Sequence, residues 1–233
     1  MFEEYERINN IKLVWNNLLH IGFEFASKSP SSMRIAKESH QLLLRAMVEA
    51  LRGSANISIT GRPQKSRRRW YRQAGGPWYV IEKVEIPGCK KAWRYSEPQL
   101  SQSHEIPAPS KDAGVLQPES FLLGFYDLLA MIQTPCFMHR FVHSRFVSVS
   151  AEEMQSIEWL HEAIRNEFEH FVPKLLLVSS GECLNAAEIC AKLAKNLLCD
   201  SGHLIHEGLE ALCQELERLL TQMQQIRERI ENA

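Results

Sequence analysis

The chain has 233 residues, of which 45% are hydrophobic and 24% charged, and its formal net charge is −1. That length suffices for one well-buried domain, or for one domain with a sizeable insert. No apolar run approaches the roughly 18 residues that a membrane span needs. The charged, amphipathic start also lacks the basic region and apolar core of a signal peptide. We therefore expect a soluble cytoplasmic protein with no membrane partner.

Two helices are predicted in the first part of the chain, at residues 3–27 and 32–52. Apolar residues recur at helical spacing in the first, among them Trp15 and Leu18. The Ser-Pro-Ser-Ser stretch at 29–32 interrupts the pattern and can cap the second helix. Gly53 then ends the second helix.

The character of the sequence changes between residues 54 and 117. Two β-like runs, at 78–86 and 92–95, are separated by Pro-Gly, and an earlier run at 56–60 can pair with them. Residues 97–118 hold four prolines and few apolar residues, which is typical of a linker or exposed loop. We predict a small antiparallel β-hairpin insert and linker over 54–117.

Helical patterns return after the insert. They predict helices at 118–133, at 183–199 and at 203–231, together with a long helix that starts at Ser150 and runs to about 178. The last helix carries a seam of apolar residues three or four apart, interpreted as packing inside its own bundle, with a separate dimer zipper as the alternative. The predicted fold class is mainly α, with bundle helices in 1–53 and 118–233 flanking the insert.

The six cysteines form no Cys-x-x-Cys pair, and four of them lie in helical segments. In a cytosolic chain such residues are more often small buried apolar groups than disulfides. A metal site drawn from Cys199, His203 and His206 is the alternative, but its spacing matches no standard zinc pattern. We expect neither a metal nor a cofactor.

The long helix carries a polar cluster away from its core face. At 100° per residue, Asn166 and His170 are neighbours four positions apart, so the amide can orient the imidazole. Trp159 and Ala163 fall beside the histidine, and a tryptophan outside the core stripe indicates a second surface there. We predict that this surface, with Arg165 and His170 in a pocket, meets a second copy of the chain.

The string Arg165-Asn166-Glu167-Phe168-Glu169-His170 resembles the Arg-x(4–6)-His signature of the HEPN superfamily, in which a polar residue often follows the arginine. The all-α context over roughly 32–52 and 118–231 is also similar to that family. Some HEPN toxins carry a tyrosine two positions after the histidine, where this chain has Val172. Control by modification of that tyrosine is therefore not expected.

The resemblance implies a HEPN-like helical bundle and a metal-independent endoribonuclease that works as a homodimer. His170 would act as general base or acid on the ribose 2′-OH or the leaving 5′-oxygen. Arg165 would hold the scissile phosphate and stabilise its developing charge, and Asn166 would orient the histidine or the phosphate. The substrate would be tRNA or other cellular RNA, and the role that of a toxin or anti-phage defence effector whose antitoxin or activator is unknown.

The insert is strongly basic and aromatic. Residues 62–94 carry a net charge of about +8, which leaves about −9 on the rest of the chain. Arginines bind phosphates and aromatic rings stack on exposed bases. The predicted RNA-binding residues are Arg67, Arg68, Arg69, Trp70, Tyr71 and Arg72. The alternative is that the aromatics form the hairpin's own core and the arginines keep its surface polar.

Other functions remain open on the sequence. Arg165 can pair with Glu162 and Glu169 as ordinary helix surface charges, which would make the chain a helical regulator without chemistry. A second alternative is a non-catalytic RNA-binding or protein-interaction module that keeps a HEPN-like helical fold. Dimerisation and the proximity of two His170 side chains distinguish these possibilities.

Overall fold

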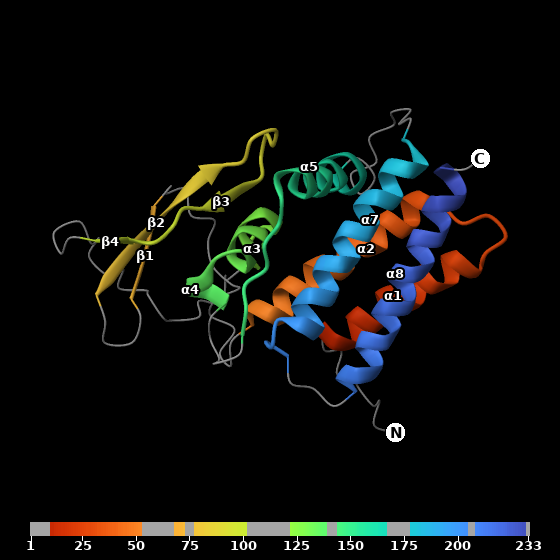
Figure 1. Cartoon of the computed structure of the whole chain (residues 1–233), viewed down its shortest axis with the longest axis horizontal. Coiled ribbons are helices and arrows are strands. Elements are labelled where there is room, and N and C mark those ends of the chain that lie inside the picture. The colour runs from red at the N-terminus through yellow and green to blue at the C-terminus, as the bar shows by residue number, and fades with distance from the viewer. Residues whose placement is uncertain are drawn as a thin grey trace, which may run out of the picture.

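The computed structural model is mainly helical, with a small antiparallel sheet at one end (Figure 1). It describes residues 10–52, 68–72, 77–101, 122–138, 144–166, 178–204 and 208–231. For residues 69–72, 164–166 and 230–231 the description covers the backbone alone. Within the described part, no helix is both long and apolar enough to cross a membrane.

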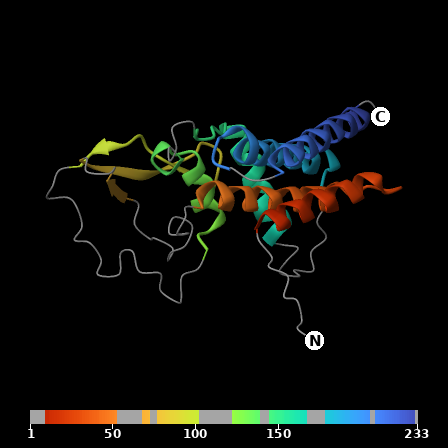
Figure 2. The ribbon, with the colours of Figure 1, turned by 90° about the horizontal axis from the view of Figure 1, so that it is seen from below.

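Four long helices form the main body. They are α1 (Asn10–Ala26), α2 (Ser32–Leu51), α7 (Ser180–Lys195) and α8 (Leu209–Glu231). Helix α1 contacts α2 and α8, and α7 contacts the same two helices, so the four close into a bundle. Seen from below, α1 and α2 lie in one layer and α8 lies in another (Figure 2). Leu18, Leu43 and Leu216 are fully buried between them.

The apolar seam of α8 faces this bundle. Leu212, Leu216, Leu219 and Met223 are buried in the core, and Leu209 packs against it. A helix whose apolar stripe is already covered has no such stripe left for a partner. The interpretation of α8 as a helix of its own bundle is therefore confirmed over these positions, and a separate zipper through them is excluded.

Shorter helices connect the bundle to the sheet. They are α3 (Phe125–Ile132), α4 (Pro135–Met138) and α5 (Ala151–Trp159), which continues into the π-helical segment η2 (Leu160–Asn166); a second π-helical segment, η3 (Asn196–Asp200), follows α7. The capping box at Ser150 is confirmed, because its hydroxyl accepts from Glu153 N while Glu153 Oε2 accepts from Ser150 N. The helix predicted from Pro118 instead begins at Phe125, since Gly124 has an extended backbone and acts as its N-cap.

The sheet has β2 (Trp78–Glu85) at its centre. Strand β1 (Arg68–Arg72) pairs antiparallel with one edge of β2, while β3 (Trp93–Tyr95) and β4 (Gln99–Leu100) also pair antiparallel with β2. The predicted hairpin of β2 and β3 is confirmed. Strand β1 was not predicted, because five residues with three arginines carry no apolar alternation. The candidate strand at 56–60 lies outside the described residues.

The expectation that the cysteines are small buried apolar groups rather than disulfides is wrong for one pair. Cys199 at the end of η3 and Cys213 in α8 form a disulfide, with their Cα atoms 5.9 Å apart. The sequence placed both in helices but did not place them side by side. A disulfide-bonded Cys199 offers no thiolate to a metal, which removes the alternative metal site; His206 lies outside the described residues. Among the residues that are described, no group of metal-binding side chains is gathered.

Reduction of this disulfide is expected to lower the free energy of unfolding by up to about 3 kcal/mol, because the bridge closes a short loop in the unfolded chain. The sequence separation is 14 residues. Thiol titration of the unreduced, denatured protein should find four thiols, those of Cys89, Cys136, Cys183 and Cys190. Six thiols, or an unfolding midpoint unaffected by reductant, would contradict the pairing.

Candidate functional site

The predicted catalytic motif begins in the π-helical segment η2, which follows α5. Arg165 and Asn166 are the final residues of the π-helical segment, and His170 lies outside the described residues. The described segment η2 is π-helical, with more residues per turn than the α-helix assumed in the face assignment, so the assigned faces shift progressively over residues 161–166. π-Helical turns inside α-helices are frequent at functional sites, which makes η2 a candidate position for chemistry.

Trp159 and Ala163, the predicted dimer contacts, are both half-buried. Trp159 packs against the hydrophobic core of its own chain and also lines a shallow hollow of about 210 Å³ with Gln155 and Asn185. Part of the indole is therefore explained by packing within one chain. A role in a dimer stays a prediction for the remaining surface.

A row of polar side chains ties the motif helix to the insert. Gln155 Nε2 donates to Pro87 O at 3.1 Å. One turn on, the buried carboxylate of Glu158 accepts from the backbone N–H groups of Lys90, Lys91 and Ala92, at 2.8 Å from Lys90 and 3.1 Å from Ala92. The β2–β3 turn is thus held against α5 by three backbone groups, of which the buried Ala92 N–H would otherwise lack an acceptor.

Gly88 allows this close approach. It sits in the β2–β3 turn with φ +82°, a conformation that residues with a Cβ rarely adopt. A Cβ at this position would also lie 2.2 Å from Gln155 Nε2. The Pro-Gly pair was correctly predicted as a turn. The sequence did not predict that this turn packs against the motif helix.

Glu162 forms the next contact along the row. Its Oε1 accepts from the Tyr126 hydroxyl at 2.9 Å, and its Oε2 pairs with Lys91 Nζ. Burial alone would raise the pKa of Glu162, but the hydrogen bonds from Lys91 and Tyr126 outweigh it and the pKa is lowered. Burial and the Glu162 carboxylate raise the pKa of Tyr126 well above its usual range. At neutral pH the contact is therefore a phenol donating to an ionised carboxylate.

Beneath this surface row, two histidines meet in the core. His40 of α2 and His161 of η2 are 2% and 6% exposed, with His40 Nε2 2.9 Å from His161 Nδ1. The Phe125 ring stacks on both imidazoles, at centroid distances of 4.5 Å and 4.4 Å. Since one nitrogen must donate and the other accept, the two rings hold complementary tautomers. The first π-helical turn is thereby fixed to α2.

Replacing His40 by phenylalanine is expected to lower the free energy of unfolding by about 1–3 kcal/mol, because it removes the partner of a buried imidazole nitrogen. Urea unfolding followed by circular dichroism measures the change. The matched control is His20→Phe on α1, where the side chain is 61% exposed and the effect should stay within about 0.5 kcal/mol. Equal effects of the two substitutions would contradict a structural role for the pair.

The predicted RNA-binding residues belong to β1, apart from Arg67, which lies outside the described residues. Arg68 is exposed and pairs with Glu82 on β2 at 2.6 Å. For Arg69, Trp70, Tyr71 and Arg72 the strand register gives the positions, opposite residues 81 to 78 of β2 in that order. A strand alternates its residues between two faces, so this set does not form one surface.

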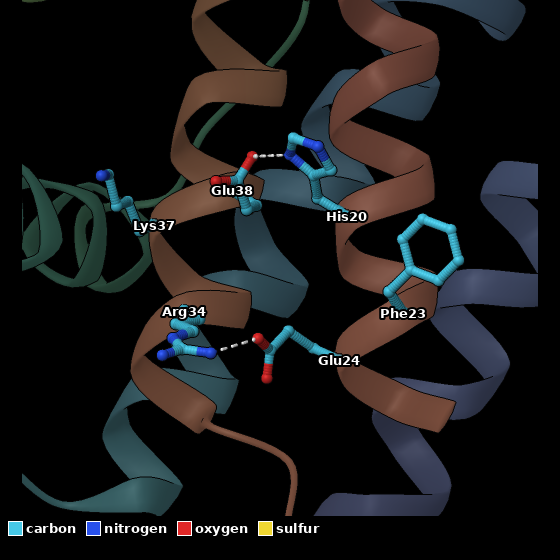
Figure 3. A pocket seen from close by; sticks show the side chains of 6 residues that line it. All are labelled: His20, Phe23, Glu24, Arg34, Lys37 and Glu38. Carbon is cyan, nitrogen blue, oxygen red and sulfur yellow. Dashed lines mark hydrogen bonds and ion pairs between the residues drawn. The ribbon is translucent and has the colours of Figure 1, made fainter. Parts of the chain in front are cut away.

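A second hollow, of about 370 Å³, lies between α1 and α2 (Figure 3). Figure 3 shows two pairs of side chains meeting between the helices, with His20 Nδ1 3.5 Å from Glu38 and Arg34 3.1 Å from Glu24, while Lys37 points away from α1. Glu38 also accepts from the Asn17 amide at 2.6 Å. These contacts join the helix pair, and we assign no chemistry to the hollow.

The chain matches no protein-family model, and comparison with curated proteins and with solved structures likewise finds no match. Sequence reasoning missed Glu158, His40 and Tyr126 as supports of the motif helix. His161 falls on the predicted core stripe of that helix, which was the one signal available for the histidine pair. A buried carboxylate such as Glu158 gives no such signal, because its partners are backbone groups distant in sequence.

Proposed function

We propose that this protein is a metal-independent endoribonuclease of the HEPN type, acting on tRNA or other cellular RNA as a homodimer. The observation that carries the proposal is the string Arg165-Asn166-x-x-x-His170 in the sequence, of which Arg165 and Asn166 belong to the π-helical segment η2. The helix before it is held by Glu158, His161 and Glu162, which are engaged with the insert, α2 and α3. Rigid support of this kind is what a catalytic group needs to keep its geometry.

The reaction follows from the chemistry of the motif. His170 takes the proton of a ribose 2′-OH, whose oxygen attacks the adjacent phosphorus. Arg165 stabilises the negative charge that develops on the phosphoryl oxygens. The P–O5′ bond breaks, the 5′-oxygen takes up a proton, and the products carry a 2′,3′-cyclic phosphate and a 5′-hydroxyl. Because the 2′-OH is the nucleophile, DNA is not a substrate.

The proposal is tested by incubating purified protein with total RNA and labelled tRNA in EDTA, and by analysing the ends of the products. Cleavage that leaves cyclic-phosphate and 5′-hydroxyl ends, with no cleavage of DNA of the same sequence, is the expected result. Cleavage that EDTA abolishes would overturn the metal-free mechanism. Binding of RNA with no cleavage under any condition tested would favour the second candidate, a non-catalytic RNA-binding module, which the basic insert also fits.

A further inference from the structure

The two faces of the sheet differ in what covers them. One face carries Ile81, which is fully buried, and Lys83, whose Nζ lies 3.8 Å from the centroid of the Trp93 ring and 3.3 Å from Asp127 of α3. On the same face Tyr95 contacts the Phe137 ring of α4, with centroids 5.6 Å apart. This face packs on α3 and α4, and its aromatic residues form the hairpin's own small core.

The opposite face points away from those helices. Residues paired directly across antiparallel strands share a face, so the register assigns β1 residues to it through their β2 partners. Arg68, Trp70 and Arg72 pair with Glu82, Val80 and Trp78, and Arg94 of β3 pairs with Val84. Val84 is 37% exposed although it is apolar, and Arg94 and Arg68 are exposed. By the same register, Arg69 and Tyr71 belong to the packed face.

We infer that this outer face, defined by Arg68, Trp70, Arg72, Trp78, Val84 and Arg94, binds single-stranded RNA. It combines three arginine positions with two tryptophan positions, and Glu82, the partner of Arg68, is its one acidic position among the described strands. The remainder of the chain is acidic, so a polyanion is attracted to the insert and repelled elsewhere. The occupant is assigned as RNA on the basis of the proposed function.

Single-stranded rather than double-stranded RNA fits this surface. Bases within a duplex are stacked on each other and present only their edges and the backbone, whereas an unpaired base offers a ring face to a tryptophan. A sheet face with tryptophans at diagonal positions of the β1–β2 ladder, Trp78 opposite Arg72 and Trp70 opposite Val80, is suited to stacking of successive bases. The arginines then hold the phosphates of the same strand.

Binding is measured with the full chain carrying His170→Ala, so that the result does not depend on cleavage. The probe is a labelled single-stranded RNA of about twelve nucleotides, followed by fluorescence anisotropy across a salt titration. Trp70→Ala is expected to weaken binding by about tenfold. Arg72→Gln should weaken binding and make the logarithmic salt slope shallower by about 0.7, the contribution of one phosphate contact to a single strand.

Arg69→Gln is the matched control, with the same charge change on the same strand but on the packed face, and it should leave the salt slope nearly unchanged. Val84→Glu tests the face at an exposed position that folding does not need, and should weaken binding without changing the unfolding midpoint. Equal losses for Arg69→Gln and Arg72→Gln would overturn the assignment of the face. Binding of an RNA duplex, or of single-stranded DNA, as tightly as single-stranded RNA would overturn the assigned ligand.

These outcomes are separable from those of the cleavage assay. An enzyme whose outer-face variants bind and cleave normally would retain the proposed function and lose this inference. A protein that binds single-stranded RNA through the face but cuts nothing would retain this inference and lose the enzyme.

Discussion

Replacing His170 by alanine is expected to lower kcat/KM for RNA cleavage by about 10²- to 10⁴-fold, the usual contribution of a general acid or base. Replacing Arg165 by alanine should cost about 10²- to 10³-fold, because it removes the group that stabilises charge on the transferring phosphoryl oxygens. Initial rates on a labelled tRNA, at substrate concentrations well below and above KM, measure both. The loss should fall mainly on kcat for His170→Ala, because proton transfer occurs only in the transition state.

The controls separate chemistry from folding. Arg165→Lys keeps the positive charge but loses the planar fork of donors, so it should recover only part of the rate. Glu152→Gln alters an exposed residue of the same helix and should leave the rate unchanged. Both motif variants should keep the unfolding midpoint of the parent protein. Full activity in His170→Ala or Arg165→Ala would remove the proposed mechanism.

Replacing Glu158 by alanine is expected to lower the free energy of unfolding by about 3 kcal/mol. The substitution leaves the backbone N–H groups of Lys90, Lys91 and Ala92 without the carboxylate they donate to, and buried donors that lose a charged acceptor are costly. Glu158→Gln retains one acceptor oxygen and should cost about 1 kcal/mol. Urea titration measures the free energy of unfolding of each variant. The control is Glu152→Ala, an exposed position of the same helix, which should change the free energy of unfolding by less than about 0.5 kcal/mol.

A second readout of Glu158 comes from a nearby thiol. Burial raises the pKa of Cys89 to about 11, with further contributions from the negative charge of Glu158 and a hydrogen bond to it. Removing the carboxylate should lower the thiol pKa and speed alkylation of Cys89 at mildly alkaline pH, because the thiolate is the reactive form. Unchanged stability together with unchanged alkylation would show that Glu158 is not a buried acceptor.

The elements that the sequence predicted well were those with a strong local pattern. The capping box at Ser150, the apolar seam of α8 and the β2–β3 hairpin all rest on residues within a few positions of each other. Strand β1 was missed because its arginines and aromatics carry no apolar alternation, and it becomes a strand only by pairing with β2. The late start of α3 followed from the extended backbone of Gly124.

The candidate site was predictable only in part. The motif itself is a local string, but the supports of its helix are side chains and backbone groups from distant parts of the sequence. His40 and His161 are 121 residues apart, and Lys90 and Glu158 are 68 apart. The π-helical turn was also unpredictable from spacing, since the same residues fit an uninterrupted α-helix. It alters the faces on which residues 161–166 lie.

The contacts of Gln155, Glu158 and Glu162 determine how a deletion of the insert would affect the rest of the fold. In the sequence, residues 54–117 have the character of a separate insert that a shorter loop could replace. In the folded chain, excising them would remove the partners of Gln155 and Glu158 and one of the two partners of Glu162, and would leave the buried Glu158 carboxylate without its donors. We therefore expect a deletion of the insert to damage the helix that carries Arg165, so that a loss of activity in such a deletion would not by itself reveal a role in substrate binding.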